Sequence, residues 1–208
     1  MKNEKNKYDL ITNQFDNDRS KSLREKKYLD LFIKGMAPKA HILDIGCGMA
    51  EPIAKYIIEK GFKLTGVDSS QEMLSLARQR FPQVEWLYGD MRDIELTIQY
   101  DGIIAYDSFF HLIVEDQIKM LERFSHWLKR KGKLLITTGS QEGEVIDAPM
   151  HGVPFSYYSM ASENYVKHLE MNKFTILLSE EDQPRHQIWI ALKNEDKDET
   201  DSSSNQKF

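Results

Sequence analysis

A short apolar run that ends at an acid and turns over two glycines constrains the fold of this sequence most. Residues 42–45 contain Asp44 as their only polar member, which is typical of a strand buried on both faces of a parallel sheet. Gly46 and Gly48 allow a sharp turn and a close approach of a ligand to the backbone, and Pro52 suits the first turn of a helix. The stretch therefore predicts strand, glycine loop and helix. Taken alone, it also fits an ordinary tight turn.

The same pattern of a strand followed by an acid recurs along the chain. Further strands are predicted at residues 63–68, 84–88, 100–107 and 132–138, with helical patterns between them. The acids Asp68, Asp90 and Asp107 stand at the ends of the first three of these strands. Five alternations of strand and helix indicate an α/β fold with a doubly wound, mostly parallel sheet and right-handed crossovers.

The ends of the chain depart from this alternation. Ser22 and Glu25 predict a capping box for an N-terminal helix. Residues 140–158 are interpreted as a long irregular stretch, 162–171 as a helix, and 175–179 with 187–192 as an antiparallel hairpin. We predict a helical cap at 1–37, a core at 38–193 and a disordered acidic tail at 194–208.

Composition limits the classes of function. The chain has 208 residues, a formal net charge of -5 and one cysteine, Cys47, so it lacks an internal disulfide framework and suits a reducing compartment. No segment resembles a membrane span or a signal peptide. Without a dense basic face, neither a nucleic acid nor a membrane is expected as a partner. We expect a cytoplasmic monomer or homodimer with a small-molecule substrate and no metal.

The acids at the strand ends predict a nucleoside site. In an open parallel sheet, ligands bind beyond the carboxyl ends of the strands, where the strand order reverses. A carboxylate at Asp68 can accept hydrogen bonds from both hydroxyls of a ribose, and Asp90 can accept one from an adenine amine, with Met91 beside the ring. Asp44 suits a positive amino group or a sulfonium.

The nature of the nucleoside depends on Glu51. A dinucleotide-binding loop would place its third glycine at this position, where helix amides receive a pyrophosphate. The negative charge of Glu51 opposes such a ligand, so phosphates are disfavoured. S-adenosylmethionine, a nucleoside with a sulfonium and no phosphate, fits the pattern better.

The motif Asp44-x-Gly46-x-Gly48, followed by Asp68, Asp90 and the Asp107 turn, resembles the class I S-adenosylmethionine-dependent methyltransferase family over about residues 8–193. The resemblance implies a Rossmann-like, seven-stranded sheet with an antiparallel last strand. It also implies residues that contact the cofactor or its product S-adenosylhomocysteine: Tyr8, Arg19, Asp44, Gly46, Cys47, Gly48, Asp68, Ser69, Asp90, Met91 and Tyr106. Ala50 replaces the third glycine that is frequent in the family.

Methyl transfer by in-line displacement requires mainly alignment of the acceptor, and a general base is optional. His111 is the first candidate for a base, because it follows the fourth strand in an aromatic turn and titrates near neutrality. The acceptor is not identified by the sequence. Candidate contacts to it are Phe110, His111, His151, Tyr157, Tyr158 and His186. An NAD(P)-dependent oxidoreductase and a catalytically inactive cofactor-binding protein remain as alternatives.

Overall fold

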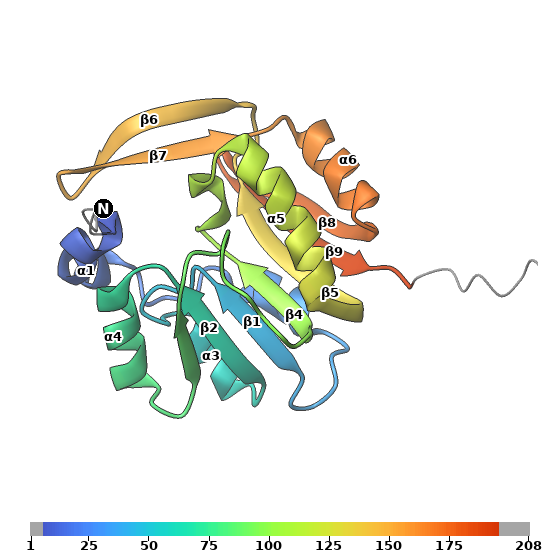
Figure 1. Cartoon of the computed structure of the whole chain (residues 1–208), viewed down its shortest axis with the longest axis horizontal. Helices are drawn as coiled ribbons and strands as arrows, with labels where there is room; N and C mark the ends of the chain where they lie inside the picture. Colours follow the sequence, from blue (N-terminus) through green and yellow to red (C-terminus); the bar gives the residue numbers. More distant parts are fainter. Residues whose placement is uncertain (1–5, 196–208) are drawn as a thin grey trace, which may run out of the picture.

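The structure is a computed structural model that describes residues 6–195, in which helices flank a twisted sheet (Figure 1). The helices are α1 (Lys7–Asp18), α2 (Lys26–Ile33), α3 (Ile53–Glu59), α4 (Gln71–Arg80), α5 (Val114–Trp127) and α6 (Ser162–Met171), with one 3-10 turn η1 (Phe109–His111). The strands are β1 (His41–Ile45), β2 (Lys63–Asp68), β3 (Glu85–Tyr88), β4 (Tyr100–Ala105), β5 (Leu128–Thr138), β6 (Gly143–Met150), β7 (Val153–Ser159), β8 (Phe174–Gln183) and β9 (His186–Lys193).

Within the described residues, the main sheet has seven strands in the order β3-β2-β1-β4-β5-β9-β8. β1 pairs in parallel with both β2 and β4, so the strand order reverses between β1 and β4. β9 runs antiparallel to β5 and forms a hairpin with β8. The predicted doubly wound, mostly parallel sheet with a reversed last strand is confirmed, and the reversal point is where ligands bind in such sheets.

Both faces of the sheet are covered by helices. Alternate residues of β1 point to opposite faces: Ile42 joins a core with α2, α3 and α4, whereas Leu43 joins one with α5 and α6. Phe32 of α2 packs so closely on β4 that a side chain at Gly102 would collide with it. The helix at residues 26–33 therefore belongs to the layered core, and α1 lies above the ends of the strands (Figure 1).

Two helix starts differ in how they are capped. At α4 the Ser70 hydroxyl caps the helix by accepting a hydrogen bond from the Met73 amide. The predicted Ser22–Glu25 capping box is wrong, because α2 begins only after Glu25 and no side chain caps it. The Glu25 carboxylate instead accepts a hydrogen bond from Arg19 at 3.2 Å, and Ser22 pairs with Ser20.

Residues 140–158 are not irregular, and this prediction is wrong. They supply β6 and the greater part of β7, which pair antiparallel as a separate two-stranded ribbon with a bulge between Val145 and Ala148. Both faces of β6 are largely exposed, so its sequence lacks the alternation of apolar and polar residues that marks a half-buried strand. The ribbon extends over the same end of the sheet as α1 (Figure 1).

The remaining predictions about the chain ends are tested only in part. Asn194 and Glu195 are described and make contacts, the latter an ion pair with Lys131 at 2.8 Å. The rest of the predicted tail, residues 196–208, lies outside the described residues, so the division into cap, core and tail stays a prediction. Among the described helices, none has the length and apolar character needed to cross a membrane.

Candidate functional site

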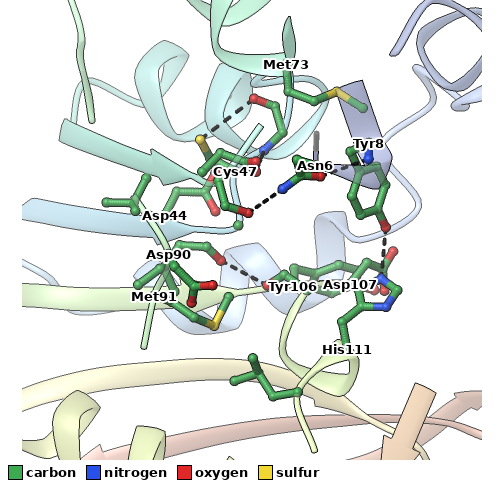
Figure 2. A pocket seen from close by; sticks show the side chains of 18 of the residues that line it. Asn6, Tyr8, Asp44, Cys47, Met73, Asp90, Met91, Tyr106, Asp107 and His111 are labelled. Carbon is green, nitrogen blue, oxygen red and sulfur yellow. Dashed lines mark hydrogen bonds between the residues drawn. The ribbon is translucent and has the colours of Figure 1, made fainter. Parts of the chain in front are cut away.

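A cavity of about 650 Å³ opens at the carboxyl ends of β1, β2 and β4, where the strand order reverses. The loop after β1 lines the cavity, as do Phe155 of β7 and Tyr8 of α1, the latter labelled in Figure 2. The volume lies within the range of about 300–1,000 Å³ that is usual for small-molecule sites.

The glycine loop takes a shape that side chains would obstruct. Gly46 and Gly48 have φ angles of 75° and 53°, in the left-handed region. A Cβ atom on Gly46 would lie 2.3 Å from the Cβ of Ser108, whereas one on Gly48 would meet nothing within 4 Å. Ala50 also has a positive φ, 71°, which explains why glycine is frequent there in the family. The loop is thus shaped by contact with the β4 turn at Gly46 and by backbone conformation elsewhere.

Asp68 connects this loop to the start of α4 through two hydrogen bonds. One oxygen of its carboxylate accepts a hydrogen bond from the Gly48 amide at 2.8 Å, and the other accepts one from the Ser70 amide at 2.8 Å. Burial raises the pKa of Asp68 to about 6, and these two bonds limit the rise. Each oxygen keeps a further lone pair that can accept a hydrogen bond from a hydroxyl group of a ligand in the cavity.

Asp44 is the most buried acid of the site. Its relative exposure is 4%, and no described group donates a hydrogen bond to its carboxylate. Burial, reinforced by the charge of Asp68, raises the pKa of Asp44 to about 7. A buried carboxylate without a donor suits a cationic or hydrogen-bond-donating ligand. Burial also raises the pKa of the neighbouring Cys47 thiol, so this cysteine is a wall of the cavity and a poor nucleophile.

Asp90 and Met91 lie on the opposite side of the cavity from Tyr8 (Figure 2). The Asp90 carboxylate receives two hydrogen bonds from the Arg92 guanidinium, at 2.9 and 2.6 Å. Arg92 holds the pKa of Asp90 below its ordinary value, although burial opposes the shift. A ligand amine at Asp90 must therefore share the carboxylate with Arg92.

A network of charged groups reaches the cavity through Arg19 and Asp107. Arg19 donates to one oxygen of Asp107 at 3.1 Å and to Glu25 at 3.2 Å, and His186 binds the other oxygen of Asp107 at 3.0 Å. The second ring nitrogen of His186 binds Asp182. Carboxylates only accept, so both nitrogens donate and His186 is an imidazolium cation. Burial favours a lower pKa for His186, but bonds to the two acids outweigh it and raise the pKa.

Tyr8 and His111 meet where α1 approaches η1 (Figure 2). The Nδ1 atom of His111 donates to the Ser156 carbonyl at 3.0 Å, which leaves Nε2 as an acceptor for the Tyr8 hydroxyl at 2.9 Å. Burial lowers the pKa of His111, so the ring is neutral at pH 7. Burial raises the pKa of Tyr8, which keeps its hydroxyl protonated.

The cavity brings together most residues that the sequence suggested. Tyr8, Arg19, Asp44, Gly46, Cys47, Gly48, Asp68, Ser69, Asp90, Met91, Tyr106, His111 and Tyr158 all line it. Phe110, Tyr157 and His186 do not, and they line a second cavity of about 470 Å³ that Tyr158 also reaches. His151 lies in neither set of lining residues, because it stands in the β6–β7 turn, 3.7 Å from Asp18.

Several lining residues were missed. Asn6, which donates to the Ser69 hydroxyl at 2.7 Å, belongs to a polar segment without a recognisable motif. Phe155 and Ser156 come from the ribbon that was interpreted as irregular. Arg92 could have been suspected from its position two residues after Asp90, where an arginine can fold back onto the acid.

Glu51 occupies the expected position at the edge of the cavity, but it is not an isolated charge. Its carboxylate lies 3.5 Å from the Arg80 guanidinium and 3.3 Å from the Lys55 ammonium. Pro52 caps α3 and lacks an amide hydrogen, so α3 offers one donor fewer than the dinucleotide-binding helix. The disadvantage for a pyrophosphate therefore comes from both features and not from the charge of Glu51 alone.

Known proteins resemble this chain both in sequence and in fold. Residues 42–132 match the family model described as a methyltransferase domain. The putative methyltransferase YqeM of Bacillus subtilis is 38% identical over 108 residues, which cover 49% of this chain and 43% of that protein. The chain spans about half the length of the curated relatives it matches.

Solved structures agree in fold across nearly the whole chain. The CcbJ methyltransferase of Streptomyces caelestis has a TM-score of 0.74 at 12% identity, covering 92% of this chain and 99% of that one. An S-adenosylmethionine-dependent methyltransferase of Clostridium acetobutylicum has a TM-score of 0.70 at 16% identity, covering 91% and 100%. At such identities these likenesses establish the Rossmann-like methyltransferase fold. Together with the match to a methyltransferase domain over residues 42–132, they support the resemblance to class I S-adenosylmethionine-dependent methyltransferases.

Proposed function

We propose that the protein transfers a methyl group from S-adenosylmethionine to a small-molecule acceptor in the cytoplasm. One observation supports this most: three carboxylates, Asp44, Asp68 and Asp90, line one cavity at the point where the strand order reverses. These carboxylates can accept hydrogen bonds from a nucleoside that carries a sulfonium, whereas the start of α3 does not favour phosphates. The net charge of -5 and the absence of a dense basic face disfavour a nucleic-acid substrate.

The residues fit the cofactor by their own chemistry. Asp44, buried without a donor, would hold the amino group of the methionine part, and Asp68 would hold the ribose hydroxyls. Asp90 and Met91 would contact the adenine ring, and Arg19 and Tyr106 would enclose the methionine part from the side of the charged network. When bound, the cofactor supplies an activated methyl group.

The protein must align the acceptor, exclude water and receive one proton. We propose that the methyl acceptor contacts Tyr8, and that His111 contacts Tyr8 and not the methyl acceptor. The reason is that Nε2, the hydrogen-bond-accepting nitrogen of the neutral imidazole, already binds the Tyr8 hydroxyl. The acceptor's proton then passes to the Tyr8 oxygen while the Tyr8 hydrogen passes to Nε2 of His111. The resulting imidazolium keeps its bond to the Ser156 carbonyl and lies in the field of Asp107.

Tyr8→Phe is expected to lower kcat by on the order of 10²-fold, because it interrupts proton transfer to His111. Tyr88→Phe, which alters an exposed tyrosine at the end of β3, is the matched control and is expected to change nothing. Burial lowers the pKa of His111 from 6.5, so the fall of wild-type kcat on acidification should have its midpoint below pH 6.5. An unchanged kcat in Tyr8→Phe would rule out this relay.

The proposed activity is tested by incubating the protein with methyl-labelled S-adenosylmethionine and pools of small amines, alcohols, phenols and carboxylic acids. Label transferred to one compound, and lost in Asp68→Ala, is the expected result. If S-adenosylhomocysteine binds in calorimetry but every pool stays unlabelled, the alternative of an inactive cofactor-binding protein gains support. If neither binding nor transfer occurs, the proposed function is wrong.

A further inference from the structure

The second cavity lies beside the first, under the β6–β7 ribbon. Its walls include Phe110 from η1, Tyr157 and Tyr158 from β7, Val145 from β6, Arg185 from the turn between β8 and β9, and His186 at the start of β9. At about 470 Å³, it is large enough for a small organic molecule.

Two features join this cavity to the cofactor cavity. Tyr158 lines both cavities. His186 lines the second one, and its Nε2 atom lies 3.0 Å from the carboxylate of Asp107, which lines the first. A molecule in the second cavity would therefore touch a group that is bonded to the wall of the cofactor site.

Aromatic rings form the inner wall of the second cavity. The rings of Phe110 and Tyr157 have centroids 5.6 Å apart at an angle of 45°, and Tyr157 also lies 4.9 Å from the ring of His111. Such ring faces bind flat apolar groups, and their negative π-faces also attract organic cations.

Acidic groups predominate around the aromatic wall. Glu142 and Glu144 line the cavity at its exposed rim, and neither forms an ion pair with a described residue. Behind the wall, the positive charge of His186 is already matched by Asp107 and Asp182. Arg185 is the opposing cation, and Glu181 lies beside it as the acceptor of its backbone amide. The summed field at this mouth attracts cations.

We propose that the second cavity holds the body of the methyl acceptor, and that this body is a flat apolar ring system carrying a protonated amine. The ring would lie against Phe110 and Tyr157, the ammonium would face Glu142 and Glu144, and the reacting atom would extend past Tyr158 towards Tyr8. This inference rests on the proposed function, since it assigns the acceptor of that same reaction.

Tryptamine and indole-3-propionate test the proposal, because they share one ring and carry opposite charges at neutral pH. Calorimetry on the full chain saturated with S-adenosylhomocysteine is expected to show tryptamine binding about tenfold more tightly than indole-3-propionate. The double variant Glu142→Gln/Glu144→Gln should weaken tryptamine about tenfold and leave S-adenosylhomocysteine unaffected. Glu163→Gln on α6 is the matched control.

Tyr157→Ala tests whether the indoles bind in the second cavity. It removes part of the aromatic wall and should weaken the binding of both tryptamine and indole-3-propionate. Equal or tighter binding of indole-3-propionate, lost in Arg185→Gln, would overturn the assignment of a cation. Tighter binding of tryptamine to the protein alone than to the protein saturated with S-adenosylhomocysteine, or no binding of either indole, would overturn the assignment of the cavity. Failure of S-adenosylhomocysteine itself to bind the wild type would instead refute the proposed function, whatever the indoles do.

Discussion

Asp68→Ala is expected to weaken binding of S-adenosylhomocysteine by about 100-fold. A hydrogen bond to a charged group contributes about 1.5–3 kcal/mol, and 1.4 kcal/mol corresponds to a factor of ten, so the loss of two ribose contacts accounts for this factor. Calorimetric titration of the variant with S-adenosylhomocysteine measures the effect directly.

The same substitution also affects the fold, because Asp68 accepts the amides of Gly48 and Ser70. Each buried donor left unpaired costs about 1–3 kcal/mol, so the melting temperature of Asp68→Ala should fall. Asp101→Ala is the matched control: its carboxylate accepts the His41 amide at 2.8 Å and pairs with Lys129 at the other end of the sheet. If both variants lose affinity for S-adenosylhomocysteine to the same extent, the loss reflects stability and the ribose assignment is wrong.

Gly46→Ala is expected to abolish binding of S-adenosylhomocysteine and to lower the melting temperature. The new Cβ would lie 2.3 Å from the Cβ and 2.6 Å from the hydroxyl oxygen of Ser108, so the glycine loop or the β4 turn must move into the cavity. The positive φ of 75° adds a cost of about 1–2 kcal/mol. Calorimetry and thermal denaturation measure both effects.

Gly35→Ala separates the two contributions. Gly35 has a φ of 80° but open space around its Cβ position, so this variant should lose stability alone and bind S-adenosylhomocysteine normally. Adding Ser108→Gly to Gly46→Ala removes the colliding atoms and should recover part of the affinity. Wild-type affinity in Gly46→Ala would contradict the close packing of the loop that lines the cavity.

The fold could be predicted from the sequence because its buried strands are short apolar runs that end in acids. Residues 42–45 and 64–67 are buried on both faces, which is typical of a parallel sheet covered by helices on each side. The β6–β7 ribbon could not be recognised by the same rule. Its exposed strand β6 needs no apolar alternation, and the glycines and prolines around it resemble a loop.

The candidate site could be predicted where a residue's place follows from the sheet alone. Asp44 and Asp68 lie near the carboxyl ends of β1 and β2 and Asp90 follows β3, and parallel strands bring these ends to one edge. The contacts to the acceptor depend instead on how α1 and the ribbon fold over that edge. For this reason His111 and Tyr158 reach the first cavity, whereas Phe110, Tyr157 and His186 lie in the second and His151 lies outside both.

The contacts around Asp107 could not be predicted from the sequence, because they join residues far apart in the chain. Asp107 is held between Arg19, 88 residues before it, and His186, 79 residues after it. These bonds change what each group can do, because both oxygens of Asp107 and both ring nitrogens of His186 are engaged. Spacing along the chain carries no information about such pairs.

The most direct test of the central claim is a calorimetric titration of the unmodified protein with S-adenosylhomocysteine and, separately, with NAD. The claim is that the cavity after β1 accepts a nucleoside without phosphates, because Asp44 and Asp68 favour an amine and a ribose and the start of α3 does not favour a pyrophosphate. We predict saturable binding of S-adenosylhomocysteine and none of NAD. Binding of NAD without binding of S-adenosylhomocysteine would contradict the account.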